Sequence, residues 1–234
     1  MNKLYLLGNQ IGNWSDVPPR TIEMLENASL VVCEWQIVFD KLVQELGITI
    51  SAECVELERD QDNADEFYSL VEEHLGLGDV VLITDAGYPM IADVGWFLGR
   101  HVLSKGYEVS IIAGPSIATT AQAVSFFSSF YENFIWLELF QYDENTKKEK
   151  LYELIELPYN IVLADTVANT QSTAELLGNI FGSREANLIF NLTMPTEKII
   201  RTTADNLAKE YEAILCEHPD DVEKHLVTIV IAGA

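Results

Sequence analysis

Basic residues are scarce in this sequence. Its 234 residues include 14 Lys and Arg against 37 Asp and Glu, a formal net charge of -23 at pH 7. Proteins that bind nucleic acids normally use Lys and Arg to neutralise phosphates and release counterions. A surface this negative repels a phosphate backbone at long range. The composition therefore argues against a nucleic-acid partner, and it is compatible with a well-hydrated surface or with a cationic, neutral or protein partner.

Cysteines and long apolar runs are also scarce. The three cysteines, Cys33, Cys54 and Cys216, are scattered and form no CxxC pair. This pattern predicts neither a disulfide scaffold nor a zinc site, and it favours a reducing compartment. The apolar run at the N-terminus breaks at Gly8, which does not fit a signal peptide. No run approaches the roughly 20 residues that span a bilayer. We expect a cytoplasmic protein with no membrane segment.

Several common catalytic motifs are missing as well. The sequence contains no GxxxxGK[ST] loop, no GxSxG elbow, and no GxGxxG after its first predicted strand. Its four histidines show no metal-ligand spacing. The sequence therefore disfavours P-loop and dinucleotide-binding proteins, serine hydrolases and metalloenzymes, and we expect no metal.

Short apolar runs alternate with helical patterns in the first half of the chain. This βαβα order predicts a parallel sheet with helices on both faces. The predicted strands are 4–7, 30–33, 48–55, 80–84 and 108–113, and the predicted helices are 19–28, one that ends at Gly47, 64–75 and 94–105.

The second half repeats the theme after a hinge at Gly114-Pro115-Ser116, where Ser116 is placed to cap the next helix. We predict an α/β fold with two lobes, residues 1–113 with a mostly parallel sheet and residues 114–234 with a mixed sheet. In the second lobe the predicted strands are 134–139, 160–164, 186–190, 197–202 and 226–231, and the predicted helices are 146–157, 170–181 and 204–210.

Three glycine-containing loops, 8–13, 84–89 and 113–116, follow predicted parallel strands. Open α/β sheets bind ligands at the carboxyl ends of their strands. Glycine allows a ligand to approach the backbone closely. Each loop alone could be a simple turn. The three together predict a ligand site at one edge of the sheet.

Residues 3–34 and 79–124 resemble the tetrapyrrole methylase superfamily, and within it most closely the small-subunit ribosomal RNA ribose 2′-O-methyltransferases. The most specific block is TDAGYPMIADVG at 84–95, which is similar to the family pattern SDAGTPxISDPG. A weaker collinear similarity continues to about residue 203. The resemblance implies an S-adenosylmethionine-dependent methyltransferase, generally a homodimer, that binds its cofactor in the cleft between two α/β lobes.

The same resemblance implies the site residues. Glu34 and Asp165 match acidic family positions at strand ends, and either is a candidate base for the proton of a methyl acceptor or a structural cap or ion-pair partner. Gln10 and Ile11 would line the mouth that faces the substrate. The cofactor would be cradled, mainly by backbone groups, by Asp85, Ala86, Gly87, Tyr88, Pro89, Met90, Ile91 and Ala92, followed by Ser116 and Ile117, and covered by Leu163, Ala164, Asn191, Leu192 and Thr193.

The chain departs from the ribosomal RNA enzymes at basic positions. Their EDTR, YESPHR and RELTK segments correspond here to EWQI (34–37), ADTVAN (164–169) and FNLTM (190–194), which lack the Arg, His and Lys. A phosphate that is held by Arg is not held by Ile or Asn. We therefore expect a methyltransferase with an unidentified acceptor. The alternatives are a ribosomal RNA ribose 2′-O-methyltransferase and a non-catalytic S-adenosylmethionine-binding protein.

Overall fold

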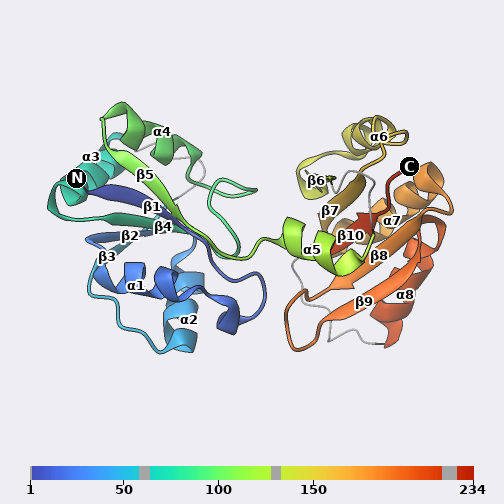
Figure 1. Ribbon diagram of the computed structural model, residues 1–234, viewed down its shortest axis with the longest axis horizontal. Helices are drawn as coiled ribbons and strands as arrows, with labels where there is room; N and C mark the ends of the chain where they lie inside the picture. Colours follow the sequence, from blue (N-terminus) through green and yellow to red (C-terminus); the bar gives the residue numbers. More distant parts are fainter. Residues whose placement is uncertain (1, 58–63, 128–132, 218–225) are drawn as a thin grey trace. The chain divides into compact units, whose positions relative to one another are not determined.

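The structure is a computed structural model that describes residues 2–57, 64–127, 133–217 and 226–234. The chain divides into two compact units, Met1–Ser116 and Ile117–Ala234. Each unit is built on a five-stranded sheet, all parallel in the first unit and mixed in the second (Figure 1). The predicted fold class, two α/β lobes with one parallel and one mixed sheet, is confirmed.

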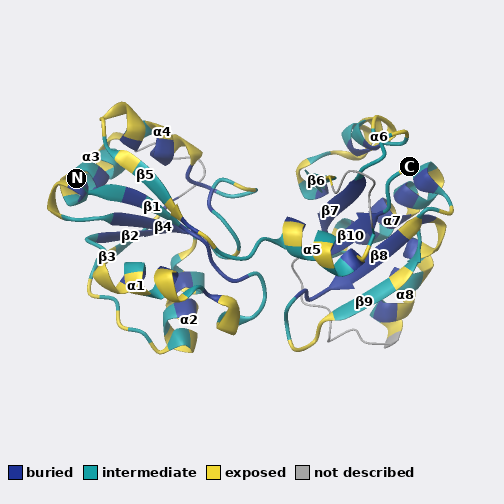
Figure 2. Cartoon of the chain, in the orientation of Figure 1, coloured by how far each residue is buried: buried dark blue, intermediate teal, exposed yellow. Residues whose placement is uncertain are grey.

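The first sheet has the strand order β3-β2-β4-β1-β5, and every pair in it is parallel. Figure 2 shows its central strands as buried. The runs LVVC of β2 and VVLI of β4 are apolar throughout because helices cover both faces of the sheet. The strands are β1 (Lys3–Leu7), β2 (Leu30–Cys33), β3 (Glu53–Glu56), β4 (Val80–Ile83) and β5 (Glu108–Ile112).

Two pairs of helices cover this sheet. Leu25 of α1 and Phe39 of α2 belong to the hydrophobic cluster on one face, and Val71 of α3 and Leu98 of α4 belong to the cluster on the other (Figure 1). Gly47 ends α2 at a φ of 63°, a backbone conformation that suits glycine. The helices are α1 (Pro19–Asn27), α2 (Gln36–Leu46), α3 (Ala64–Leu77) and α4 (Trp96–Ser104), with a 3-10 turn η1 at Trp14–Asp16.

The third strand is shorter than the sequence predicts. It begins at Glu53, which pairs with Leu30 at the start of β2, so residues 48–52 have no strand beside them. Ile48 and Ile50 nevertheless pack against the core cluster that includes Phe39. Their alternating pattern therefore reflects burial and not strand pairing.

The second sheet has the order β6-β7-β10-β8-β9, in which only β6 and β7 are parallel. Helices α6, α7 and α8 cover one face, where Leu151, Leu177 and Tyr211 join the core, and α5 packs on β7 and β10. The elements are α5 (Ile117–Ser125), β6 (Phe134–Glu138), η2 (Leu139–Gln141), α6 (Glu144–Tyr152), β7 (Asn160–Thr166), α7 (Val167–Phe181), β8 (Glu185–Phe190), β9 (Lys198–Thr203), η3 (Ala204–Asn206), α8 (Leu207–Glu217) and β10 (Leu226–Ile231).

Two helices of the second unit begin earlier than their apolar patterns predict, α6 by two residues and α7 by three. The Asp143 side chain accepts hydrogen bonds from the backbone N–H groups of Asn145 and Thr146, which starts α6 at Glu144. None of the helices in the described part of the chain is both long and apolar enough to cross a membrane.

Candidate active site

The carboxyl ends of the parallel strands form the candidate site of the first unit. β1 and β4 are neighbours in the sheet. The connection that follows β1 passes β4 to reach β2, and the connection that follows β4 passes β1 to reach β5. The two connections run in opposite directions along the sheet, and their helices, α1 and α4, pack on opposite faces. In open α/β sheets the point where neighbouring connections part in this way marks the ligand site. The loops after β1 and β4 are the segments that a ligand would meet there.

Asn9 joins these two loops. Its Nδ2 donates to the carbonyl oxygens of Thr84 at 2.8 Å and Asp85 at 3.1 Å. Its backbone N–H donates to the carbonyl of Gly87 at 2.7 Å, and the Gly87 N–H donates to the carbonyl of Gln10 at 2.9 Å. Asn9 is only 1% exposed, so water competes little for these bonds. The two loops therefore form one fixed backbone surface.

The loop after β5 meets the loop after β1 at a pair of glycines. A Cβ on Gly8 would lie 2.6 Å from the Gly114 nitrogen, and a Cβ on Gly114 would lie 2.9 Å from the Gly8 carbonyl carbon. Only glycine fits at such an approach. The Tyr88 hydroxyl donates to the Gly114 carbonyl at 2.8 Å and accepts from the Gly114 N–H at 2.6 Å. All three predicted ligand loops are thus tied together.

The loop after β4 holds its backbone in an unusual conformation. Met90 and Ala92 have φ angles of 71° and 68°, although neither is glycine. Each such residue costs on the order of 1–3 kcal/mol and persists only where its surroundings impose it. The Met90 N–H donates to the Val94 carbonyl at 3.0 Å, which closes the turn. Strain of this kind concentrates at ligand sites, so it supports the prediction that 85–92 is a ligand loop.

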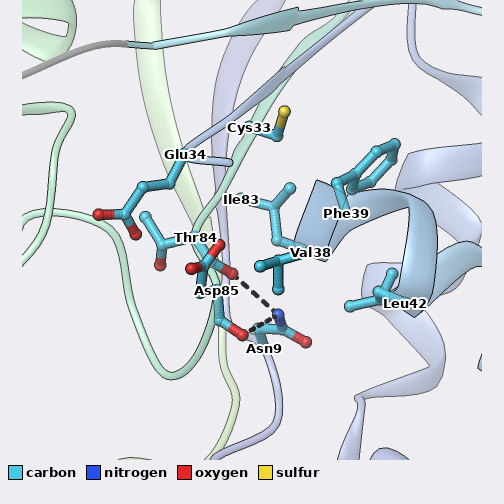
Figure 3. A pocket seen from close by; sticks show the side chains of 9 residues that line it. All are labelled: Asn9, Cys33, Glu34, Val38, Phe39, Leu42, Ile83, Thr84 and Asp85. Carbon is cyan, nitrogen blue, oxygen red and sulfur yellow. Dashed lines mark hydrogen bonds between the residues drawn. The ribbon is translucent and has the colours of Figure 1, made fainter. Parts of the chain in front are cut away.

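A small acidic pocket, with an internal space of about 10 Å³ that could hold about one water molecule, lies beside this loop. Figure 3 shows Val38, Phe39 and Leu42 of α2 on one side and Glu34 and Asp85 on the other. None of the described residues that line it is Lys or Arg. The lining residues are Asn9, Cys33, Glu34, Val38, Phe39, Leu42, Ile83, Thr84 and Asp85.

Asp85 has a strongly perturbed carboxyl group. Burial, together with the negative charges of Glu34 and Glu56, raises the pKa of Asp85 to about 6. Glu56 accepts a hydrogen bond of 2.9 Å from the Gln36 N–H at the start of α2, which fixes its carboxylate near the strand ends. Three adjacent strands, β2, β3 and β4, thus bring carboxyl groups to one edge of the sheet.

Comparison with known proteins identifies the family. Residues 3–208 match the model of the Tetrapyrrole (Corrin/Porphyrin) Methylases. The chain belongs to this family. It is 27% identical over 231 residues to the Ribosomal RNA small subunit methyltransferase I of Rickettsia prowazekii, which covers 98% of this chain and 78% of that protein. The predicted family is confirmed, and this tetrapyrrole methylase is an S-adenosylmethionine-dependent methyltransferase.

Solved structures of the family share the fold. A cobalt precorrin-4 methyltransferase matches with a TM-score of 0.66 at 17% identity, covering 99% of this chain and 94% of that chain. The uroporphyrin-III C-methyltransferase of Thermus thermophilus in complex with S-adenosylhomocysteine matches with a TM-score of 0.62 at 16% identity, covering 98% and 92%. The fold of the tetrapyrrole methylases therefore extends over nearly the whole chain.

The tied loops of this tetrapyrrole methylase fit S-adenosylmethionine. Adenine is neutral and the methionine tail is zwitterionic, so amide and carbonyl groups suit both. Gln10 is 6% exposed, and its Nε2 is 3.4 Å from the Asp85 carbonyl. Its Oε1 is buried and has no hydrogen-bond partner within the described part of the chain. A buried acceptor without a partner is costly, and a bound ligand that donates to it would remove that cost.

In the second unit, Asp165 lies in a buried ion pair at the end of β7. Its Oδ2 is 2.5 Å from the Lys147 Nζ and accepts a 2.6 Å hydrogen bond from the Thr173 hydroxyl, while its Oδ1 accepts from the Thr166 N–H at 2.8 Å. Asp165 is 2% exposed and Lys147 is 5% exposed. This bonding favours a structural role over proton transfer, and the catalytic role of Asp165 stays a prediction.

The other predicted cofactor residues of the second unit occupy two environments. Leu163 belongs to the core cluster that also contains Leu177 of α7, and Ala164 is buried on the opposite face of β7. Asn191 and Thr193 follow β8 with φ angles of 50° and 68°, and between them Leu192 is buried. This strained turn resembles the one after β4. The contacts of these five residues with the cofactor stay predictions, as do those of the half-buried Ser116 and Ile117.

Sequence reasoning misses Asn9, Glu56 and Lys147. Asn9 carries a usable signal, because it is a polar residue within the glycine-containing loop that follows the first buried strand. Glu56 falls one residue beyond the predicted end of the third strand, so the sequence pattern does not predict that its carboxylate lies at the ligand edge of the sheet. Lys147 carries no signal, because its partner Asp165 lies on a different element.

Proposed function

We propose that this tetrapyrrole methylase binds S-adenosylmethionine on the tied loops of its first unit and transfers the methyl group to an acceptor other than ribosomal RNA. The observation that carries the proposal is the backbone surface made by Asn9, Gly87 and the Gly8–Gly114 contact, next to a pocket lined by carboxylates. The fixed backbone suits the cofactor, and the carboxylates disfavour an acceptor that carries phosphates.

The chain's own groups divide the work of methyl transfer. Residues 85–92, with Gln10, Ile11 and Ser116, would hold the cofactor, which supplies a methyl group activated on a sulfonium. Fixed loops reduce the cost of aligning the two reactants. Glu34, which borders the pocket, would accept the proton that the acceptor loses as the new bond forms. The apolar wall of Val38, Phe39 and Leu42 would exclude water from the pocket.

Ribosomal RNA methylation is the second candidate function. The name of the Rickettsia prowazekii relative favours it, since that protein matches along 98% of this chain. The lost basic residues at 37 and 169, the net charge of -23 and the acidic lining of the pocket oppose it. A third candidate, a cofactor-binding protein without catalysis, is consistent with the same losses.

A methyl-transfer assay separates these functions. Purified protein is mixed with S-adenosylmethionine carrying a labelled methyl group, in one reaction with unmodified small ribosomal subunits and in another with ribosome-free extract of the source organism. We expect label only in the second reaction, and a strong decrease of transfer in Glu34→Gln with an unchanged calorimetric affinity for the cofactor. Label in the ribosomal RNA would establish the second candidate, and cofactor binding without any transfer would establish the third.

The assembly and location of the protein are also proposals. We propose a homodimer, because Trp96, Phe97 and Phe126 are large apolar side chains with 52%, 69% and 81% of their surface exposed. We propose a cytoplasmic location because Cys33 and Cys54 are free thiols even though their sulfur atoms lie 3.6 Å apart, as expected in a reducing compartment. Light scattering coupled to size-exclusion chromatography tests the dimer, and a monomer at all concentrations would overturn it.

A further inference from the structure

The hydroxyl group of Tyr88 pairs with both polar backbone groups of one residue in another loop. It donates to the Gly114 carbonyl at 2.8 Å and accepts from the Gly114 N–H at 2.6 Å. A hydroxyl has one donor and acceptor lone pairs, so a single side-chain atom satisfies both groups. The resemblance gives Tyr88 a place in the cofactor cradle mainly through its backbone, which leaves these two side-chain hydrogen bonds without an assigned role.

The backbone on either side of Tyr88 is fixed by its neighbours. Gly87, which precedes it, donates its N–H to the Gln10 carbonyl at 2.9 Å and accepts from the Asn9 N–H at 2.7 Å. Pro89, which follows it, has a φ angle that its own ring restricts. The aromatic ring therefore extends from a fixed position in the loop after β4 to the loop after β5.

The residue that Tyr88 holds lies just before a predicted part of the cofactor site. Gly114 is followed by Pro115, whose ring restricts its φ angle, and then by Ser116, the last residue of the first unit. Glycine adopts many backbone conformations, so an unanchored Gly114 would let the segment after it take many orientations. Two hydrogen bonds to Gly114 remove much of that freedom. The Tyr88 hydroxyl therefore restricts where Ser116 lies relative to residues 85–92.

These two hydrogen bonds produce a cofactor site that is ordered in advance. A loop that is already ordered costs less to order when its ligand binds. We propose that Tyr88 is a positioning residue of the cofactor site, whose hydroxyl holds residues 113–116 beside residues 85–92 before S-adenosylmethionine binds. Tyr88 acts through Gly114 and takes no part in the methyl-transfer step. The inference rests on the proposed function, because it requires that the cofactor occupies these loops.

Calorimetry with S-adenosylhomocysteine tests the effect on affinity. This product carries no transferable methyl group, so its binding is measured without turnover. Tyr88→Phe keeps the ring and removes both hydrogen bonds to Gly114. We expect its Kd to rise about tenfold, because the fraction of molecules with an ordered loop falls to about a tenth. Tyr107→Phe removes a hydroxyl next to the amino end of β5, at the opposite edge of the sheet, and is the matched control that should bind as the unmodified protein does.

Nuclear magnetic resonance separates positioning from a general effect on stability. In ligand-free Tyr88→Phe we expect the amide resonance of Ser116 to broaden, because the loop exchanges between conformations. We expect the amides of β1 and β4 to keep their positions. Saturating S-adenosylhomocysteine should sharpen the Ser116 resonance again. A residue that only stabilised the fold would leave both this resonance and the Kd of the folded variant unchanged.

The outcomes separate this inference from the function on which it rests. An unmodified protein that does not bind S-adenosylhomocysteine would overturn the proposed function, and the inference with it. Binding by the unmodified protein with equal affinity in Tyr88→Phe, or an equal loss in Tyr107→Phe, would overturn the inference alone. If Tyr88→Phe does not fold, hydrogen exchange of the unmodified, ligand-free protein decides. A protected Gly114 amide supports the inference, and one that exchanges as fast as an exposed loop amide overturns it.

Discussion

Replacing Asp85 by Asn should stabilise the protein above pH 6. The pKa of the carboxyl group rises from 3.8 to about 6 in the folded state because of burial, Glu34 and Glu56. A raised pKa means that the folded state binds the proton more tightly than the unfolded state does. The ionised carboxylate therefore lowers the free energy of unfolding as the pH rises through this interval, and it has no such effect below about pH 4.

The size of this effect follows from the pKa shift. One pKa unit corresponds to 1.36 kcal/mol, so a shift of this size would give about 3 kcal/mol for a fully shielded group. Asp85 is half-buried, and solvent screening reduces the expected gain to about 1–2 kcal/mol. Asn keeps the size of the side chain, and the substitution leaves the backbone carbonyl free to accept from Asn9 and Gln10.

Urea unfolding measures this gain. The free energies of unfolding of the unmodified protein, Asp85→Asn and a control, Glu26→Gln, which removes an exposed charge from α1, are compared at about pH 8 and about pH 4. We expect Asp85→Asn to be more stable at the higher pH only, and Glu26→Gln to stay within about 0.5 kcal/mol of the unmodified protein at both. A gain of equal size at both pH values, or a loss at the higher pH, would refute the electrostatic reasoning.

Three further substitutions test the contacts that shape the units. Lys147→Met should cost about 3–5 kcal/mol in urea unfolding, because it leaves the buried Asp165 unpaired, and adding Asp165→Asn should recover part of that loss. No recovery would contradict the ion-pair account. Gly114→Ala should cost about 1–3 kcal/mol through its clash with Gly8, and should abolish the calorimetric signal of S-adenosylmethionine. Tyr88→Phe should cost about 1–3 kcal/mol by unpairing Gly114, and an unchanged unfolding midpoint would show that this bond is dispensable.

Much of the fold is visible in the sequence because burial and periodicity coincide. The fully apolar runs 30–33 and 80–83 are central strands with helices on both faces, and their pattern admits few alternatives. Prediction fails where another force sets the boundary. Residues 48–52 alternate like a strand but lack a neighbour, and the cap of Asp143 starts α6 earlier than the apolar pattern does.

The candidate site is predictable in part. The loop 84–95 carries a family pattern, and its position after a buried strand points to the ligand edge. The crossing contacts are not predictable, because Asn9 bonds to Thr84 and Asp85 across 75 residues or more of sequence. The raised pKa of Asp85 is not predictable for the same reason. β2 and β3 bring Glu34 and Glu56 close to this carboxyl group only when the sheet forms.

The tied loops at the end of the first sheet are tested most directly by mapping where the cofactor product binds. S-Adenosylhomocysteine is added to uniformly ¹⁵N-labelled protein, and changes in the backbone amide resonances are recorded. The account predicts that the largest changes fall on the backbone amides of residues 10–11, 85–92 and 114–116, apart from Pro89 and Pro115, which have no N–H. Saturating ligand that leaves these amides unchanged, or that shifts only amides far from the strand ends, would contradict it.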